Sequence, residues 1–172
     1  MTVIQKQCLL AFFGLYPHGE IDGIWGPKSR SAMEHFEERY PDKTLTEAVE
    51  EWKEQYFWQS VRHWNREEFR CRCGGKYCDG FPAEPDETLV RLLDDVREDL
   101  GAPGIPSSGI RCPQHNANVG GVANSKHLSG KAMDFMVLGI SGQELLYRAQ
   151  SDPRTNYAYI IDNGPYIHVD VV

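Results

Sequence analysis

The sequence predicts an α+β domain built on an antiparallel sheet, preceded by a small all-α domain. Apolar residues recur at helical spacing up to about residue 60, whereas β-branched and aromatic segments dominate the end of the chain. The 172 residues, 41 % of them hydrophobic, suffice for one domain with a smaller companion and exclude a disordered chain. We therefore expect a helical domain over residues 1–60 and an α+β domain over 61–172.

Three helices are expected in the first domain. Apolar residues at helical spacing indicate a helix over 4–12, and a glycine-rich, turn-like segment over 14–26 follows it. Pro27 suits the first turn of the second helix, where its missing N–H leaves no hydrogen bond unmade. Thr44 with Glu47 forms a capping-box pattern, which predicts the start of the third helix.

The second domain is expected to alternate between helices and short strands. Residues 60–85 show no periodicity, but a leucine-rich stripe predicts a helix over 86–100, and Ser141 caps a shorter helix. A loop rich in glycine, asparagine and proline is expected up to about Lys126. Strands are expected over 105–111, 132–137, 157–161 and 166–171. The turn-forming residues 162–165 join the last two strands as a hairpin, which makes the sheet antiparallel.

Charge and hydropathy exclude several functions. Acidic residues outnumber basic ones by 25 to 18, which gives a net charge of −7, whereas non-specific nucleic-acid or membrane-surface binding favours basic proteins. No apolar run approaches the roughly 20 residues of a membrane span. The first residues lack the basic and apolar regions of a signal peptide. We expect no nucleic-acid partner, no membrane insertion, and synthesis in the cytoplasm without a signal peptide.

Two histidines and a carboxylate suggest a metal site. Side chains alternate along a strand, so His168 and Asp170 share one face of the last strand, opposite its apolar residues. His127 precedes Asp134 by seven residues, with small residues between them. Two imidazoles and one carboxylate can bind zinc and leave a fourth position open, as catalytic zinc sites do.

The segment around these residues resembles a known family. Residues 125–134 follow the pattern Ser-x-His-x-x-Gly-x-Ala-x-Asp. This pattern resembles the zinc D-alanyl-D-alanine carboxypeptidase superfamily, which also contains L-alanyl-D-glutamate endopeptidases of phage endolysins and the hedgehog signalling domain. Residues 107–116 and 166–170 are similar to two further segments of that family, in the same order. The resemblance covers about residues 65–172.

The resemblance implies a role for each site residue. It makes His127, Asp134 and His168 the zinc ligands, and it matches Arg111 to the arginine that holds the substrate carbonyl or its terminal carboxylate. Many members place an acidic general base three positions before the last histidine, where this chain has Pro165. The hedgehog branch has a glutamate six positions before it. Asp162 occupies that position here and is the favoured general base.

Asp170 is the alternative to Asp162 as general base, because it shares a strand face with His168. It could equally orient a metal ligand.

The first domain carries a second resemblance. Residues 15–36 are similar to the small helical peptidoglycan-binding domain, including its Asp-Gly pair at Asp22 and a glycine at Gly26. Trp25 and Ser29 replace the usual phenylalanine and threonine, and both changes are mild. The resemblance implies that peptidoglycan is the partner. No protein partner is evident.

Together the two resemblances imply a zinc metallopeptidase. The expected reaction is hydrolysis of an amide bond in the peptidoglycan stem or cross-link, by a carboxypeptidase or endopeptidase of a phage or prophage lytic type that acts at the bacterial cell wall. The alternative is an inactive, zinc-containing wall-binding module or a phage structural component.

A cysteine cluster precedes the peptidase core. The chain has five cysteines, an odd number that argues against a purely disulfide-stapled domain. A second, structural zinc could bind Cys71, Cys73, Cys78 and Cys112, although their spacing is not the usual pair of pairs. Structural zinc, disulfides and free thiols are therefore all open.

Overall fold

The computed structural model describes residues 1–172 and divides into two compact units, Met1–Gln59 and Ser60–Val172. None of its helices combines the length and the apolar character that crossing a membrane requires.

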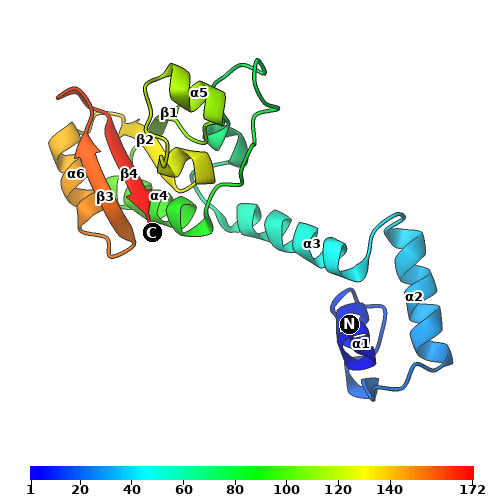
Figure 1. Ribbon diagram of the computed structural model, residues 1–172. Coiled ribbons are helices and arrows are strands. Elements are labelled where there is room, and N and C mark those ends of the chain that lie inside the picture. Colours follow the sequence, from blue (N-terminus) through cyan, green and yellow to red (C-terminus); the bar gives the residue numbers. More distant parts are fainter. The chain divides into compact units, whose positions relative to one another are not determined.

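The N-terminal unit is helical (Figure 1). Its elements are α1 (Val3–Phe12), the 3-10 helix η1 (His18–Glu20), α2 (Pro27–Arg39) and α3 (Leu45–Ser60). Pro27 occupies the first turn of α2, and Thr44 and Glu47 exchange capping hydrogen bonds at the start of α3, as predicted. The buried core consists of Leu10, Ala11, Tyr16, Ala32, Phe36, Leu45 and Ala48.

The C-terminal unit is an α+β domain, which confirms the predicted class. Its helices are η2 (Arg66–Phe69), α4 (Glu87–Leu100), α5 (Pro113–Asn118), η3 (Lys126–Ser129) and α6 (Gly142–Gln150). Its strands are β1 (Gly104–Ser108), β2 (Ala132–Val137), β3 (Thr155–Ile160) and β4 (Ile167–Val171). They form one antiparallel sheet in the order β1-β2-β4-β3.

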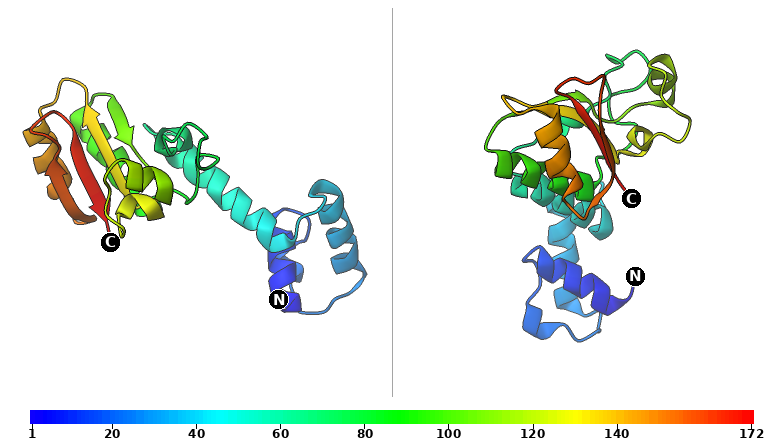
Figure 2. Two further views of the ribbon diagram at one scale, coloured as in Figure 1. Left: turned by 45° about the horizontal axis from the view of Figure 1, so that its top comes forward. Right: turned by 90° about the vertical axis from the view of Figure 1, so that its left-hand side faces the viewer.

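Helices α4 and α6 cover one face of this sheet (Figure 2). The leucine-rich stripe of α4 is buried, and so are the residues of the central strands that alternate toward it. On β2 and β4 these are Met133, Phe135, Val137, Ile167, Val169 and Val171. Because side chains alternate, Asp134, His168 and Asp170 lie on the opposite face.

Two details of the C-terminal unit differ from expectation. The first strand ends at Ser108 rather than near Arg111, because Ile110 N–H donates to Phe69 O and Arg111 N–H to His127 O, so both leave the ladder. The expected loop up to Lys126 contains the short helix α5, because Cys112 caps its N-terminus and Pro113 suits its first position. The sheet face opposite the helices is also covered at its centre, since His168 on this face is only 9 % exposed.

Candidate metal centre

Three elements bring His127, Asp134 and His168 together. Asp134 on β2 and His168 on β4 are direct partners across the antiparallel ladder. His127 lies on η3, which ends at Gly130 in the left-handed conformation (φ 72°) and leads the chain directly into β2. One ligand atom from each residue lies within 4.8 Å of the other two.

The donor atoms are two imidazole nitrogens and one carboxylate oxygen. His127 Nε2 lies 3.2 Å from Asp134 Oδ1 and 3.3 Å from His168 Nδ1. His168 Nδ1 lies 2.7 Å from the same carboxylate oxygen. All three residues are buried or nearly so, since their side chains are 2–11 % exposed.

A backbone carbonyl sets the orientation of His127. Its Nδ1–H donates to Gly109 O at 2.6 Å, which leaves the Nε2 lone pair directed toward Asp134 and His168. Gly109 itself packs against the backbone of Phe69, where an added Cβ would lie 2.4 Å from the carbonyl oxygen. The lack of a side chain at residue 109 therefore allows this carbonyl to reach the histidine.

A carboxylate sets the orientation of His168 in the same way. Asp170 Oδ2 lies 3.3 Å from His168 Nε2, and an ionised carboxylate can only accept, so the proton resides on Nε2. Asn156 Nδ2 donates to the other oxygen of Asp170 at 2.8 Å. His168 thus presents an unprotonated Nδ1. Of the two roles expected for Asp170, its position fits that of a residue that orients a metal ligand.

Asp134 uses its two oxygens differently. Oδ1 faces the histidines, whereas Oδ2 accepts a hydrogen bond of 2.6 Å from Arg111 Nη2. Arg111 Nε donates to Ser108 Oγ, and its Nη1 makes no hydrogen bond within the chain. Burial alone would raise the pKa of Asp134, but its close contacts with the imidazoles of His127 and His168 outweigh burial and hold this pKa well below its ordinary value, so Asp134 is a carboxylate.

This donor set fits zinc. Zinc bonds of about 2.0–2.2 Å to nitrogen and oxygen in tetrahedral geometry separate the ligand atoms by about 3.4 Å. The separations of 2.7–3.3 Å in the structure require only a small expansion. Each imidazole also donates its other N–H to a fixed acceptor, as metal-binding histidines do. Three protein ligands leave a fourth position for water or substrate, which is characteristic of a catalytic rather than a structural site.

The structure places Asp162 apart from these three residues. It lies in the turn between β3 and β4, is exposed, and adopts a left-handed conformation (φ 50°). It makes no hydrogen bond with His127, Asp134 or His168. Its negative charge nonetheless acts on Tyr159, whose pKa is raised mainly by burial and further by Asp134 and Asp162.

Sequence reasoning missed Tyr159. This residue pairs with His168 across β3 and β4, and the two rings stack with centroids 5.1 Å apart and an interplanar angle of 28°. Its side chain is 44 % exposed, so the ring flanks the histidine at the edge of the site. The alternation of residues 157–161 predicts a strand, but only the register of that strand on β4 shows which residue meets His168.

The structure also brings together the second expected group of metal ligands. The sulfur atoms of Cys71, Cys73, Cys78 and Cys112 all lie within 4.8 Å of one another. All five cysteines of the chain are free thiols, and Cys8 is exposed in the other unit.

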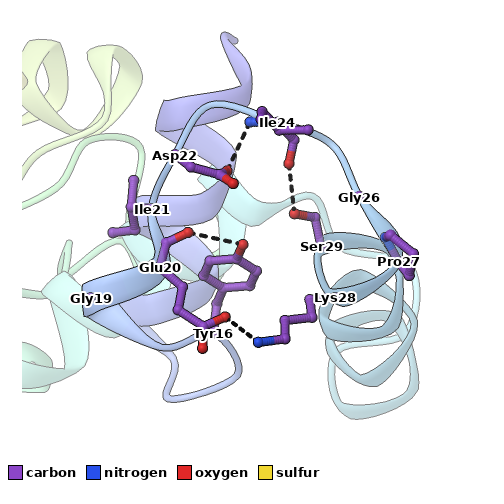
Figure 3. A pocket seen from close by; sticks show the side chains of 10 residues that line it. All are labelled: Tyr16, Gly19, Glu20, Ile21, Asp22, Ile24, Gly26, Pro27, Lys28 and Ser29. Carbon is purple, nitrogen blue, oxygen red and sulfur yellow. Dashed lines mark hydrogen bonds and ion pairs between the residues drawn. The ribbon is translucent and has the colours of Figure 1, made fainter.

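The N-terminal unit contains a separate pocket with a volume of about 650 Å³ (Figure 3). It is lined by Tyr16, residues 19–22, Ile24 and residues 26–29, and therefore by the segment that resembles a peptidoglycan-binding domain. Tyr16 OH donates to Glu20 O, and the carboxylate of Asp22 accepts from Ile24 N–H. The buried Gln7 supports this loop, because its amide group bonds to both Asp22 and Gly23.

Comparison with known proteins identifies the family. The family model Peptidase M15 matches residues 62–170, which include all of the sheet except Val171, both groups of metal ligands and Arg111. The chain therefore belongs to the Peptidase M15 family, a zinc D-alanyl-D-alanine carboxypeptidase superfamily of metallopeptidases. M15 peptidases use zinc, which agrees with the donor set at His127, Asp134 and His168. No curated protein matches the chain.

Proposed function

We propose that this protein is a lytic enzyme that hydrolyses an amide bond in the stem peptide or cross-link of peptidoglycan, with zinc held by His127, Asp134 and His168. The observation that carries the proposal is the convergence of these three donors, each with its remaining polar atom bound to another group. Such fixed ligands favour one metal geometry and keep both imidazoles in the tautomer that can bind the ion.

Zinc held by His127, Asp134 and His168 would supply Lewis-acid chemistry, activating a water molecule and polarising the substrate carbonyl. Arg111 lies beside the donor set, anchored by Ser108 and Asp134. Its Nη1 is free to bind the carbonyl oxygen of the scissile amide, where negative charge develops, or a terminal carboxylate of the substrate. The anchoring contacts hold the guanidinium in place before substrate binds.

We assign Asp162 as the proton acceptor in this reaction. Both oxygens of Asp170 are engaged, one with His168 and one with Asn156, so Asp170 acts as a positioning residue. Asp162 has no such partner, and the proposal is supported by the effect of its negative charge on the pKa of Tyr159, the residue that stacks on His168. Its carboxylate can take a proton from the attacking water and return it to the leaving amine.

We assign wall binding to the N-terminal unit. Its pocket is lined by the charged residues Glu20, Asp22 and Lys28, which suit polar glycan or peptide groups (Figure 3). Attachment of this unit to the polymer would raise the local concentration of the peptidase unit at its substrate. The combination of the two units supports a phage or prophage lytic role.

The proposal is tested by digesting purified peptidoglycan and identifying the products by mass spectrometry. A carboxypeptidase releases single D-alanine residues, whereas an endopeptidase exposes a new amino group within the stem or cross-link. His127→Ala should abolish whichever of the two activities the wild type shows and should reduce the zinc content.

One observation favours a second candidate, a zinc-containing module that binds the wall without cleaving it: Pro165 stands where many relatives carry the general base. A wild-type protein that retains zinc and binds peptidoglycan but releases no new amino groups would establish this candidate and overturn the first.

A further inference from the structure

The segment that joins η2 to α4 lacks regular structure. Between Phe69 and Glu87 the chain forms only turns and bends, although several of its residues are buried. Loops of this length inside a compact domain are uncommon, and those that are ordered need another source of stability. Three cysteines lie in this segment, at positions 71, 73 and 78.

The fourth cysteine approaches from a distant part of the chain. Cys112 caps the N-terminus of α5, and its backbone N–H donates to Cys71 Sγ at 3.3 Å. Cys71 and Cys112 are buried, whereas Cys73 and Cys78 are partly exposed. The four sulfur atoms lie within 4.8 Å of one another, as the ligands of a single ion would.

The separations of the sulfur atoms fit a tetrahedral ion. Zinc–sulfur bonds of about 2.3 Å place the sulfur atoms about 3.8 Å apart. Here Cys73 Sγ lies 3.5 Å from Cys78 Sγ, and every pair of the four lies within 4.8 Å. Two disulfides would require only that each sulfur atom lie close to one partner. Here all four sulfur atoms lie close to one another, which favours a shared metal ion.

The backbone around the sulfur atoms is arranged to stabilise thiolates. Cys71 Sγ accepts the Cys112 N–H, and Cys112 Sγ accepts the N–H of His115 at 3.4 Å. Gly74 and Gly75 have positive φ values of 65° and 79°, which turn the chain back between Cys73 and Cys78. Three basic residues, Arg70, Arg72 and Lys76, alternate with the cysteines in sequence, so the segment does not add further negative charge beside the thiols.

We infer that Cys71, Cys73, Cys78 and Cys112 bind a second, structural zinc ion. Four thiolates complete the tetrahedral coordination and leave no position for water or substrate, so this ion would have a structural role. It would fasten the irregular segment to residue 112, and residue 111 is the arginine of the catalytic site. The backbone N–H of Arg111 also donates to His127 O. An ion bound to Cys112 would therefore hold a backbone segment that contacts the catalytic metal ligand His127.

The first test counts metal atoms in protein purified under reducing conditions without chelator. The wild type should contain two zinc ions per chain, and His127→Ala should contain one. The double variant Cys73→Ser/Cys78→Ser should also contain one, whereas Cys8→Ser, the matched control in the other unit, should keep two. A wild type with one zinc ion, lost in His127→Ala, would overturn the inference, whatever the outcome of the peptidase assay.

The second test keeps all the cysteines and therefore does not depend on whether cysteine variants fold. An alkylating reagent should modify only Cys8 in the native protein and all five cysteines after denaturation with a chelator. Cobalt substituted into His127→Ala should show the intense charge-transfer absorption of thiolate ligands. Rapid alkylation of four or five cysteines in the native protein, or an intact mass lower by the hydrogens lost in disulfides, would contradict the inference.

Discussion

Asp134 and His168 face each other across neighbouring strands, with Oδ1 of the aspartate 2.7 Å from Nδ1 of the histidine. This pairing fixes which imidazole nitrogen faces the metal position. The other nitrogen, Nε2, meets Asp170, and the second oxygen of Asp134 meets Arg111. One cross-strand pair therefore links the metal ligands to Arg111, the residue that we propose binds the substrate.

The role of Asp170 can be tested by Asp170→Asn. An amide can present its N–H₂ group to His168 Nε2, which favours the wrong tautomer and places a proton on Nδ1. We expect zinc affinity at this site to fall by about 10- to 100-fold, as is typical when such a supporting carboxylate is lost. Competition with a chromophoric chelator measures this affinity.

Asp162→Asn serves as the contrasting variant, because it should leave zinc affinity unchanged and lower turnover. If Asp170→Asn retains full zinc affinity and loses only turnover, the assignments of the two aspartates must be exchanged.

Gly109 should not tolerate a side chain. The Cβ of Gly109→Ala would lie 2.4 Å from Phe69 O and 2.7 Å from Phe69 Cα, and these backbone atoms cannot move easily. We expect a loss of about 1–3 kcal/mol in the free energy of unfolding, together with weaker zinc binding because Gly109 O shifts away from His127. Urea unfolding and zinc titration measure the two effects. Gly19→Ala, where the added Cβ meets nothing within 4 Å, should change neither.

Tyr159 should support His168 through its ring rather than its hydroxyl. Tyr159→Ala removes the stacked ring and should weaken zinc binding by about 0.5–1.5 kcal/mol, the usual worth of an aromatic pair. Tyr159→Phe keeps the ring and should bind zinc as the wild type does. Equal losses in the two variants would show that the hydroxyl group, and not stacking, supports the site.

Asp94 should make the C-terminal unit sensitive to acid. Burial alone would raise the pKa of Asp94, but hydrogen bonds from Arg62 and from the backbone of His63 outweigh burial and lower the pKa below its ordinary value of 3.8. A lowered folded-state pKa contributes stability that is full above the unfolded-state pKa and is lost as the pH falls through the folded-state value. The stabilising effect of Asp94 should therefore decline below about pH 4.

Asp94→Asn tests this dependence. At pH 7 the variant should lose about 1–2 kcal/mol in the free energy of unfolding, because hydrogen bonds to a charged acceptor become hydrogen bonds to a neutral one. The difference from the wild type should shrink as the pH falls below 4. Hydrogen exchange of the α4 amides measures the stability of the C-terminal unit, which contains Asp94. If the difference in free energy of unfolding between variant and wild type stays constant from pH 7 to pH 3, the explanation is wrong.

Local patterns predicted much of the fold because their physical causes are local. The leucine stripe of α4, the capping pair at Thr44 and the alternation along β4 all follow from residues close together in sequence. Helix α5 was missed because its cap is Cys112, a residue seldom found at a helix N-terminus, so the segment reads as a loop.

The candidate site was only partly predictable, because many of its contacts join residues that are far apart in sequence. The resemblance named His127, Asp134 and His168, and the structure shows that their donor atoms meet. Contacts that depend on the register of the sheet, or on how a loop packs against another segment, could not be predicted from the sequence. Tyr159 over His168, Gly109 O at His127 and Arg111 on Asp134 are of this kind.

The most direct test of the central claim is a crystal structure of zinc-loaded protein with anomalous diffraction data collected on both sides of the zinc absorption edge. We predict an anomalous peak about 2.0–2.2 Å from His127 Nε2, Asp134 Oδ1 and His168 Nδ1, with a water molecule in the fourth position. Absence of a peak among these three atoms, with zinc bound elsewhere or not at all, would contradict the proposed metal centre and the hydrolytic function built on it.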